Sequence, residues 1–238
     1  QPVWGGKLLV FVEDDERAVL ERVAETASQA GVRLEARDQA FVRAREPNVR
    51  AVAALWSPDT GWIDADAYVR ALASACAALD AHLLVVTERE RIDVEAIVNA
   101  AGLFADEVSS LCGGETFRIY PCRGEYAELT PKARGLVNGL VYPVPHASGH
   151  GLGVHLTRTL SGAVWIGPSI DYRERKDDYE SERLPLEAFL EPTQRLLPAV
   201  RLEDLRLGGS GLRAKLHPAD QRYADFMVRR DRVNPRLW

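Results

Sequence analysis

Residues 141–168 read VYPVPHASGHGLGVHLTRTLSGAVWIGP, and the polar side chains that strands could bring together are densest there. Two short alternating runs, separated by Ser161-Gly162, predict a β-hairpin. Because side chains alternate across a strand, His155 and Thr157 point to one face and Leu156 to the other. The hairpin is therefore expected to have one apolar face and one polar face. A half-buried strand with a polar solvent side is the simpler interpretation of this stretch alone.

The composition is that of a globular protein. The chain has 238 residues, 46% of them apolar, which suffices for a buried core in one large domain or two ordinary ones. The formal net charge of -5 arises from 30 basic and 35 acidic residues spread along the chain, so we expect no nucleic-acid partner. No apolar run reaches the roughly 18 residues that span a bilayer, so we expect no membrane span, while peripheral contact with a membrane stays open. Cys76, Cys112 and Cys122 lack the spacing of a metal site or a disulfide framework, which predicts no bound metal and a cytoplasmic protein.

The first half of the chain alternates helices with strands. Apolar residues recur at helical spacing over 14–30 and again after Asp64, whose carboxylate is expected to cap the second helix. Strands are expected at 32–35, 51–56, 82–87 and 94–98, and the last two have the apolar character of strands buried on both faces. The buried stripe of the second helix is predicted to comprise Tyr68, Leu72, Ala75, Cys76 and Leu79.

The second half of the chain is a run of strands. From Phe117 onward, FRIYP, RGEYAEL, LVYPVP, GLGVHLT and AVWIG follow one another, with Pro and Gly clusters between them. Strands in succession after a helix-rich half predict an antiparallel or mixed sheet as a second layer. The predicted fold class is therefore α/β (α+β), in which a strand-helix-strand layer is joined to a mixed or antiparallel sheet with helices.

Two further stretches suggest contacts with a ligand. The turn at 99–102, NAAG, lies between a predicted strand and an amphipathic segment, where open sheets bind nucleotides, although a tight connection with nothing bound is the commoner case. Near the end of the chain, GGSGLRAK would let the backbone approach a ligand and places Arg213 and Lys215 on one side of a strand. The pair suits a carboxylate, and the fork of Arg213 suits it better; a solvated basic pair is the alternative.

Seven phrases of the sequence, taken in order, resemble one family. They are REPNVRAVAALWSPDTGWIDADAY, IVNAAGLFAD, YPCRGEY, LVYPVP, GLGVHLTR, the pair Gly167-Pro168, and SGLRAKL. Together they resemble the FAD-dependent oxidoreductases of the D-amino-acid-oxidase superfamily, in the branch of L-2-hydroxyglutarate oxidase or dehydrogenase. The resemblance extends from about residue 6 to residue 226.

The resemblance implies a flavoprotein with a Rossmann-like FAD domain and a mixed sheet that covers the substrate. Arg213 is then expected to anchor a substrate carboxylate. His155 is expected to orient or deprotonate the substrate hydroxyl while hydride passes to the flavin. The implied domain parts are 1–61 and 115–206 for the substrate domain, 62–114 for an incomplete FAD domain, and 207–238 for a return towards the FAD domain. The implied site residues are His155 and Arg213 as catalytic groups, Arg213, Lys215 and Thr157 at the substrate, and Ala100, Ala101, Gly102, Gly211 and Leu212 at the FAD.

The sequence departs from the family pattern in several places. No GxGxxG follows a first strand, Ala214 stands where the family usually has proline, and the piece between residues 85 and 96 is shorter. We therefore expect a fragment that lacks the amino-terminal part of the FAD domain and binds FAD poorly by itself.

The sequence leaves three functions open. In the first, the intact protein oxidises a small 2-hydroxy acid, of the L-2-hydroxyglutarate type, with FAD as cofactor. In the second, the same scaffold oxidises an amino acid such as glycine or a D-amino acid. In the third, the chain is a non-enzymatic relic or interaction module that does not bind FAD. A small carboxylate is the expected partner in the first two.

Overall fold

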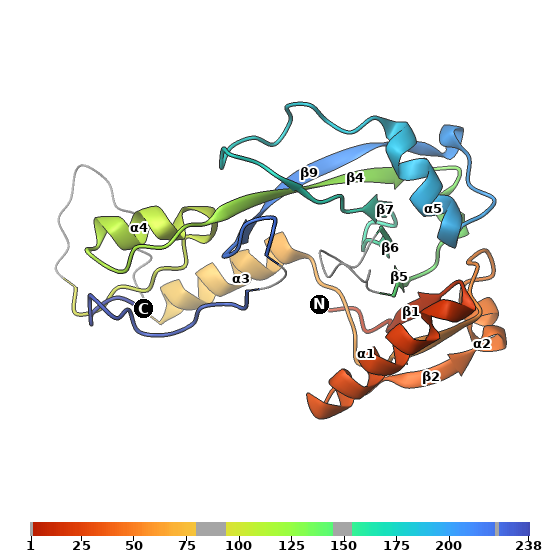
Figure 1. Ribbon diagram of the computed structural model, residues 1–238, viewed down its shortest axis with the longest axis horizontal. Helices are drawn as coiled ribbons and strands as arrows, with labels where there is room; N and C mark the ends of the chain where they lie inside the picture. The colour runs from red at the N-terminus through yellow and green to blue at the C-terminus, as the bar shows by residue number, and fades with distance from the viewer. Residues whose placement is uncertain (1, 80–93, 145–153, 222–223) are drawn as a thin grey trace.

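The structure, a computed structural model, describes residues 2–79, 94–144, 154–221 and 224–238. It is a mixed sheet with helices on both faces, from which a long two-stranded ribbon extends (Figure 1). The sheet has the strand order β2-β3-β1-β5-β6-β7-β4-β8, and β9 also pairs with β4. The strands are β1 (Lys7–Phe11), β2 (Glu35–Asp38), β3 (Ala53–Ser57), β4 (Tyr120–Leu129), β5 (Leu140–Pro143), β6 (His155–Arg158), β7 (Val164–Gly167), β8 (Asp171–Tyr172) and β9 (Leu205–Lys215). The helices are α1 (Arg17–Gln29), α2 (Gln39–Arg45), α3 (Ala65–Ala78), α4 (Ala105–Leu111) and α5 (Leu190–Leu196), and short 3-10 turns include η2 (Gly102–Phe104) and η4 (Leu186–Phe189).

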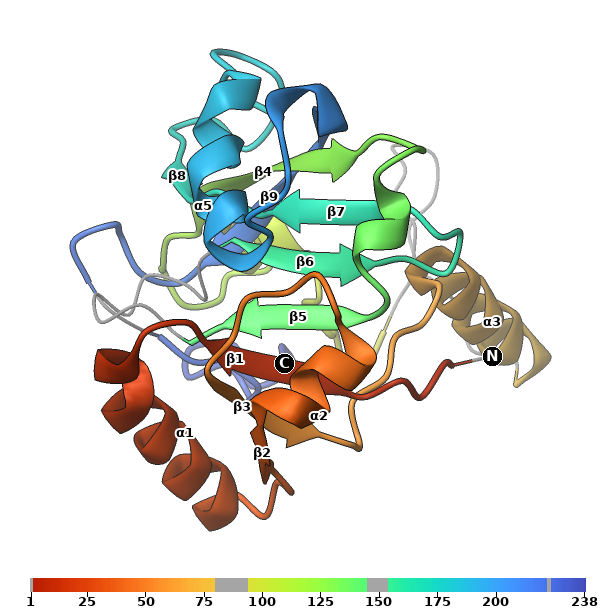
Figure 2. The same cartoon turned by 90° about the vertical axis from the view of Figure 1, so that its right-hand side faces the viewer.

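The main core lies between one face of the sheet and helices α2 and α5. Figure 2 views this face, with α2 and α5 in front of the strands. Its buried side chains include Val10 of β1, Leu156 of β6 and Ile166 of β7. On the opposite face, α1 packs Leu20 against Leu9 and other apolar side chains at the β1 end of the sheet. The remainder of that second face is where the polar side chains of the strands lie.

The predicted hairpin is confirmed. Strands β6 and β7 pair antiparallel, with His155 opposite Gly167 and Leu156 opposite Ile166. Leu156 is fully buried in the main core, so His155 and Thr157 lie on the second face, as the alternation predicts. The turn contains Gly162 at a positive φ of 81°, a conformation that glycine adopts at little cost.

Strands β4 and β9 form the long ribbon. The phrases FRIYP and RGEYAEL are predicted as separate strands, but Tyr120–Leu129 is one continuous strand, because Pro121 lies near its start, where a missing N–H is tolerated. Between Glu125 and Ala127 the register shifts, so that Gly208 and Gly209 of β9 lie opposite one residue of β4. This is a β-bulge, and a Cβ at Gly208 would lie 2.9 Å from the carbonyl oxygen of Tyr126.

Three predictions about the first half need correction. The stripe of α3 is not buried by any element of the described residues, and Leu79, just beyond its end, is 81% exposed. Periodicity predicts that a helix has an apolar face but not what covers it. The strand predicted at 32–35 lies at Glu35–Asp38, where it pairs with β3. The strand predicted at 94–98 is reduced to one bridge between Ile97 and Leu237, and the strand predicted at 82–87 lies outside the described residues.

No helix within the described ranges is both long and apolar enough to cross a membrane.

Candidate active site

A row of side chains crosses the second face of the sheet over four neighbouring strands. The ring of His155 lies 4.1 Å from the ring of Tyr142, measured between centroids. On its other side His155 pairs with Gly167. A Cβ at Gly167 would lie 3.1 Å from the ring of Tyr126 and 2.8 Å from the carbonyl oxygen of Glu125. The row therefore runs from a phenol through an imidazole to a second phenol, and between them the backbone of Gly167 packs closely against Glu125 and Tyr126.

Arg213 reaches this face from β9, at the far side of the row. Arg213 pairs with Cys122 of β4, and its side chain lies over Gly124. A Cβ at Gly124 would come within 3.1 Å of Nη2 of Arg213. Nη2 donates a hydrogen bond of 2.9 Å to the carbonyl oxygen of Ser169, which fixes the guanidinium. A larger residue at position 124 would displace it, so the glycine is part of how the charge is positioned.

Lys7 reaches the same face from β1, at the opposite side of the row. Its Nζ lies 5.1 Å from the centroid of the Tyr142 ring, a cation-π arrangement. The side chain is half-buried, and burial lowers the pKa of Lys7. Two positive charges therefore flank His155, one on each side.

The electrostatics of the row favour a neutral imidazole. Burial, followed by the nearby charges of Arg213 and Lys7, lowers the pKa of His155 to about 4. At pH 7 one ring nitrogen is therefore free to accept a proton. His155 Nδ1 and Arg213 Nε are both buried, and neither has a hydrogen-bond partner in the described part of the chain. Buried polar atoms usually have partners, so this face is short of the groups that would satisfy them.

The structure brings His155 and Arg213 onto one face of the sheet. The other two predicted substrate residues, Thr157 and Lys215, lie further from the row. Thr157 shares the face and pairs with Trp165, one step further along β6. Lys215 lies two residues beyond Arg213 and pairs with Tyr120, away from the row. Both remain predicted substrate contacts.

The predicted FAD-binding residues lie on and beside β9. Gly211 pairs with Gly124, whereas Leu212 is opposite Arg123 and points to the other face from Arg213. The Ala100-Ala101-Gly102 turn leads into η2, which contacts β9. The turn is closed locally, since the amide of Ala101 donates to Asn99 Oδ1 at 3.3 Å. Their role at FAD remains a prediction.

Sequence reasoning missed three residues of this arrangement, namely Lys7, Tyr126 and Tyr142. Both tyrosines lie in phrases that carry the family resemblance, YPCRGEY and LVYPVP, and strand alternation puts each on the face opposite its apolar neighbours. That alternation is the signal that could have found them. Lys7 has no comparable signal, because its place beside Tyr142 depends on the parallel pairing of β1 with β5, which are far apart in the sequence.

The comparison with protein families is decisive. The model of the DAO family, described as FAD dependent oxidoreductase, matches residues 3–238. The chain belongs to this family. The match confirms the resemblance seen in the sequence, and FAD is the cofactor of the family.

Curated relatives are L-2-hydroxyglutarate dehydrogenases. The protein from Salmonella houtenae is 30% identical over 204 residues, which cover 78% of this chain and 48% of the relative. The mitochondrial protein from Caenorhabditis elegans is 27% identical over 266 residues, which cover 88% of this chain and 61% of the relative. The chain thus spans about half to three fifths of the length of these relatives.

Solved structures of flavoenzymes share the fold. L-alpha-glycerophosphate oxidase from Mycoplasma pneumoniae, solved with FAD bound, has a TM-score of 0.77 at 22% identity, covering 98% of this chain and 66% of that one. Glycine oxidase from Bacillus cereus has a TM-score of 0.67 at 17% identity, covering 90% and 61%. At these identities the comparison establishes the architecture, a mixed α/β fold of this superfamily.

The residues present fit one side of a flavin site. His155 Nδ1 and Arg213 Nε are buried on this face, and no atom in the described ranges is hydrogen-bonded to either. At Gly102, Gly209 and Gly211 the space that a side chain would take is open. This space would let the flavin ring, or the chain attached to it, approach the backbone closely. The printed sequence contains no GxGxxG to cradle a pyrophosphate. The chain therefore fits the substrate side of a flavin site, whereas no motif in it fits the phosphate side.

Proposed function

We propose that the protein to which this chain belongs oxidises a small 2-hydroxy acid, of the L-2-hydroxyglutarate type, with FAD. The observation that carries the proposal is the placement, on one face of the sheet, of a neutral imidazole and of a guanidinium that has no carboxylate partner among the described residues. A 2-hydroxy acid offers a carboxylate to the guanidinium and a hydroxyl to the imidazole. The names of the curated relatives support the same substrate class.

In this proposal Arg213 holds the carboxylate next to the reacting carbon. Its guanidinium stays in place because Ser169 accepts a hydrogen bond from Nη2 and Gly124 leaves room beneath it. Charge-assisted hydrogen bonds of this kind are about twice as strong as neutral ones, so they orient the substrate as well as bind it. FAD, when bound, would supply the hydride acceptor for the carbon that bears the hydroxyl.

His155 accepts the hydroxyl proton through its unprotonated ring nitrogen, so that the C–O bond becomes the carbonyl of a 2-oxo acid. The tilted contact with the Tyr142 ring restricts the imidazole, and the pairing with Gly167 fixes the backbone that carries it. Gly167 lets β7 pack closely on β4, since a Cβ there would meet the carbonyl oxygen of Glu125 and the ring of Tyr126. The main chain of β6 and β7 thus positions the base.

Anaerobic mixing of the full-length, FAD-loaded protein with candidate substrates tests the proposal. L-2-hydroxyglutarate is expected to bleach the visible absorbance band of the oxidised flavin, whereas glycine and D-alanine leave it unchanged. Flavin reduction by the amines alone would assign the site to amino-acid oxidation. A protein that stays colourless when it is prepared at full length with FAD would contradict flavin chemistry altogether.

A further inference from the structure

Lys7 is a half-buried cation without a counter-charge among the described residues. No described residue forms a salt bridge with its ammonium group, and none accepts a hydrogen bond from it. Instead, its Nζ lies over the ring of Tyr142, which is in tilted contact with the ring of His155. Partial burial of an unpaired ammonium group costs free energy, so Lys7 calls for an anionic partner that the described residues do not supply.

Arg213 has the same property on the other side of the row. It forms hydrogen bonds only to neutral atoms, the carbonyl oxygen of Ser169 and Cys122 Sγ, among the described residues. The two cations act on His155 together, since the charges of both lower its pKa. One uncompensated cation suits a monocarboxylate, whereas two on opposite sides of one base suit a ligand with a negative charge at each end.

The spacing of the strands gives the separation of the two charges across the sheet. Nζ of Lys7 lies over the Tyr142 ring on β5, and the guanidinium of Arg213 lies over Gly124 on β4. From β5 to β4 the order is β5-β6-β7-β4, which is three steps of about 4.8 Å, so this separation is about 14 Å measured perpendicular to the strands. An extended five-carbon dicarboxylate with a hydrogen-bonded cation at each end also spans about 13 Å, from bond lengths of about 1.5 Å and charge-assisted contacts of about 2.8 Å.

We propose that Lys7 binds the distal carboxylate of a dicarboxylic substrate whose other carboxylate is held by Arg213, with His155 between them. The inference rests on the proposed function and deepens it, because it names the feature that selects a dicarboxylate. Lys7 is on this view a specificity-determining residue, and it takes no part in moving the proton.

Ligand binding to the full-length, FAD-loaded protein tests the inference without relying on turnover. The probes are glutarate, which has both carboxylates and no hydroxyl to oxidise, and pentanoate, which has a methyl group in place of the distal carboxylate. Calorimetric titration is expected to show that the wild type binds glutarate at least tenfold more tightly than pentanoate. Lys7→Met should abolish that preference through a loss of glutarate affinity of about tenfold to hundredfold, the range for a hydrogen bond between charged groups.

Two further variants keep the result unambiguous. Lys7→Arg retains the charge and should retain the preference for glutarate. Lys132→Met makes the same substitution at an exposed lysine in the turn after β4 and should bind both ligands as the wild type does. If Lys7→Met weakens glutarate and pentanoate equally, or weakens neither, the inference is wrong. If glutarate binding depends on Lys7 but L-2-hydroxyglutarate leaves the flavin oxidised, the inference stands and the proposed function fails.

Discussion

At the scale of single residues, His155 owes its behaviour to the charges beside it. Burial and the two flanking cations hold its pKa at about 4, so in the free protein it is a weak base. An anionic substrate between Arg213 and Lys7 would offset both cations and raise the pKa of the ring. The base would therefore become stronger only when the substrate is in place, which is the condition under which proton transfer is useful.

The lowered pKa also predicts how stability depends on pH. Between about pH 6.5 and about pH 4, the unfolded chain protonates this histidine and the folded chain does not, so the free energy of unfolding falls as the pH is lowered through that window. Urea unfolding of the wild type and of His155→Gln at pH 7 and pH 4.5 measures the effect. The wild type is expected to lose more stability than the variant between the two pH values. Parallel losses would mean that His155 is not buried in its neutral form.

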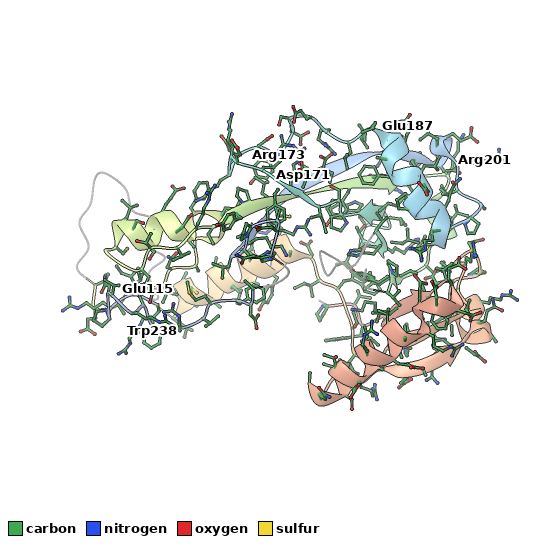
Figure 3. The ribbon with its side chains drawn as sticks, viewed as in Figure 1. Glu115, Asp171, Arg173, Glu187, Arg201 and Trp238 are labelled. Carbon is green, nitrogen blue, oxygen red and sulfur yellow. The ribbon has the colours of Figure 1, made fainter. Side chains whose placement is uncertain are left out.

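At the scale of elements, the β4–β9 ribbon serves a different purpose on each face. One face presents Arg213 to the candidate site. The other buries Arg123 and Glu125, both fully inaccessible, with Nη2 and Oε1 2.9 Å apart. Arg183 and the amide of Leu184 donate to the second oxygen of Glu125. Arg123 also faces Asp171, which pairs with Arg173 at 3.0 Å, and Figure 3 shows this last pair beside the ribbon.

This network is expected to hold the ribbon, and hence Arg213, in place. Glu125→Ala leaves Arg123 buried beside fewer acceptors, and the loss of one partner of a buried ion pair costs about 3 to 5 kcal/mol of unfolding free energy. Glu187→Ala, at an exposed position of η4, is the matched control and should change stability by no more than about 0.5 kcal/mol. Urea unfolding measures both variants. Similar stability of the two would show that the network does not support the ribbon.

At the scale of the whole molecule, the ribbon joins two ends of different character (Figure 1). The sheet, with α1, α2 and α5, holds the buried core. At the other end lie α3, α4 and the C-terminal segment, which Arg229 ties to Glu115 by an ion pair of 2.6 Å; Glu115 and Trp238 are labelled at this end in Figure 3. The apolar residues Tyr68 and Leu72 of α3 are exposed there. This contrast supports the proposed division into substrate-domain parts at 1–61 and 115–206, an FAD-domain part at 62–114, and a return at 207–238.

The strands of the site could be predicted from local pattern, and their arrangement could not. The alternation of side chains along β6 correctly predicts that His155 and Thr157 lie on one face of the sheet and Leu156 on the other. The close packing of β7 on β4 depends on Gly167, and this appears only when the pairing of the two strands is known. The position of Lys7 beside Tyr142 likewise depends on the parallel pairing of β1 with β5. These strands lie more than a hundred residues apart in the sequence, and periodicity carries no information about such a pairing.

The fold class follows from the order of elements, whereas the exposure of α3 does not. The apolar face of a helix can be predicted from the spacing of residues within one segment, but its burial requires a second segment that packs on it. None of the described residues buries the apolar face of α3. The proposed role of Arg213 rests on the family resemblance, whereas its position over Gly124 depends on the register of β4 with β9.

The most direct test separates substrate binding from flavin binding in Arg213→Leu of the full-length, FAD-loaded protein. The dissociation constant of glutarate, measured by calorimetry, should rise by about tenfold to hundredfold, as expected for the loss of hydrogen bonds between charged groups. The dissociation constant of FAD should change by less than about threefold, because Arg213 is assigned to the substrate side. An equal loss of affinity for both, or an unchanged affinity for glutarate, would contradict the assignment of this sheet face as the substrate site.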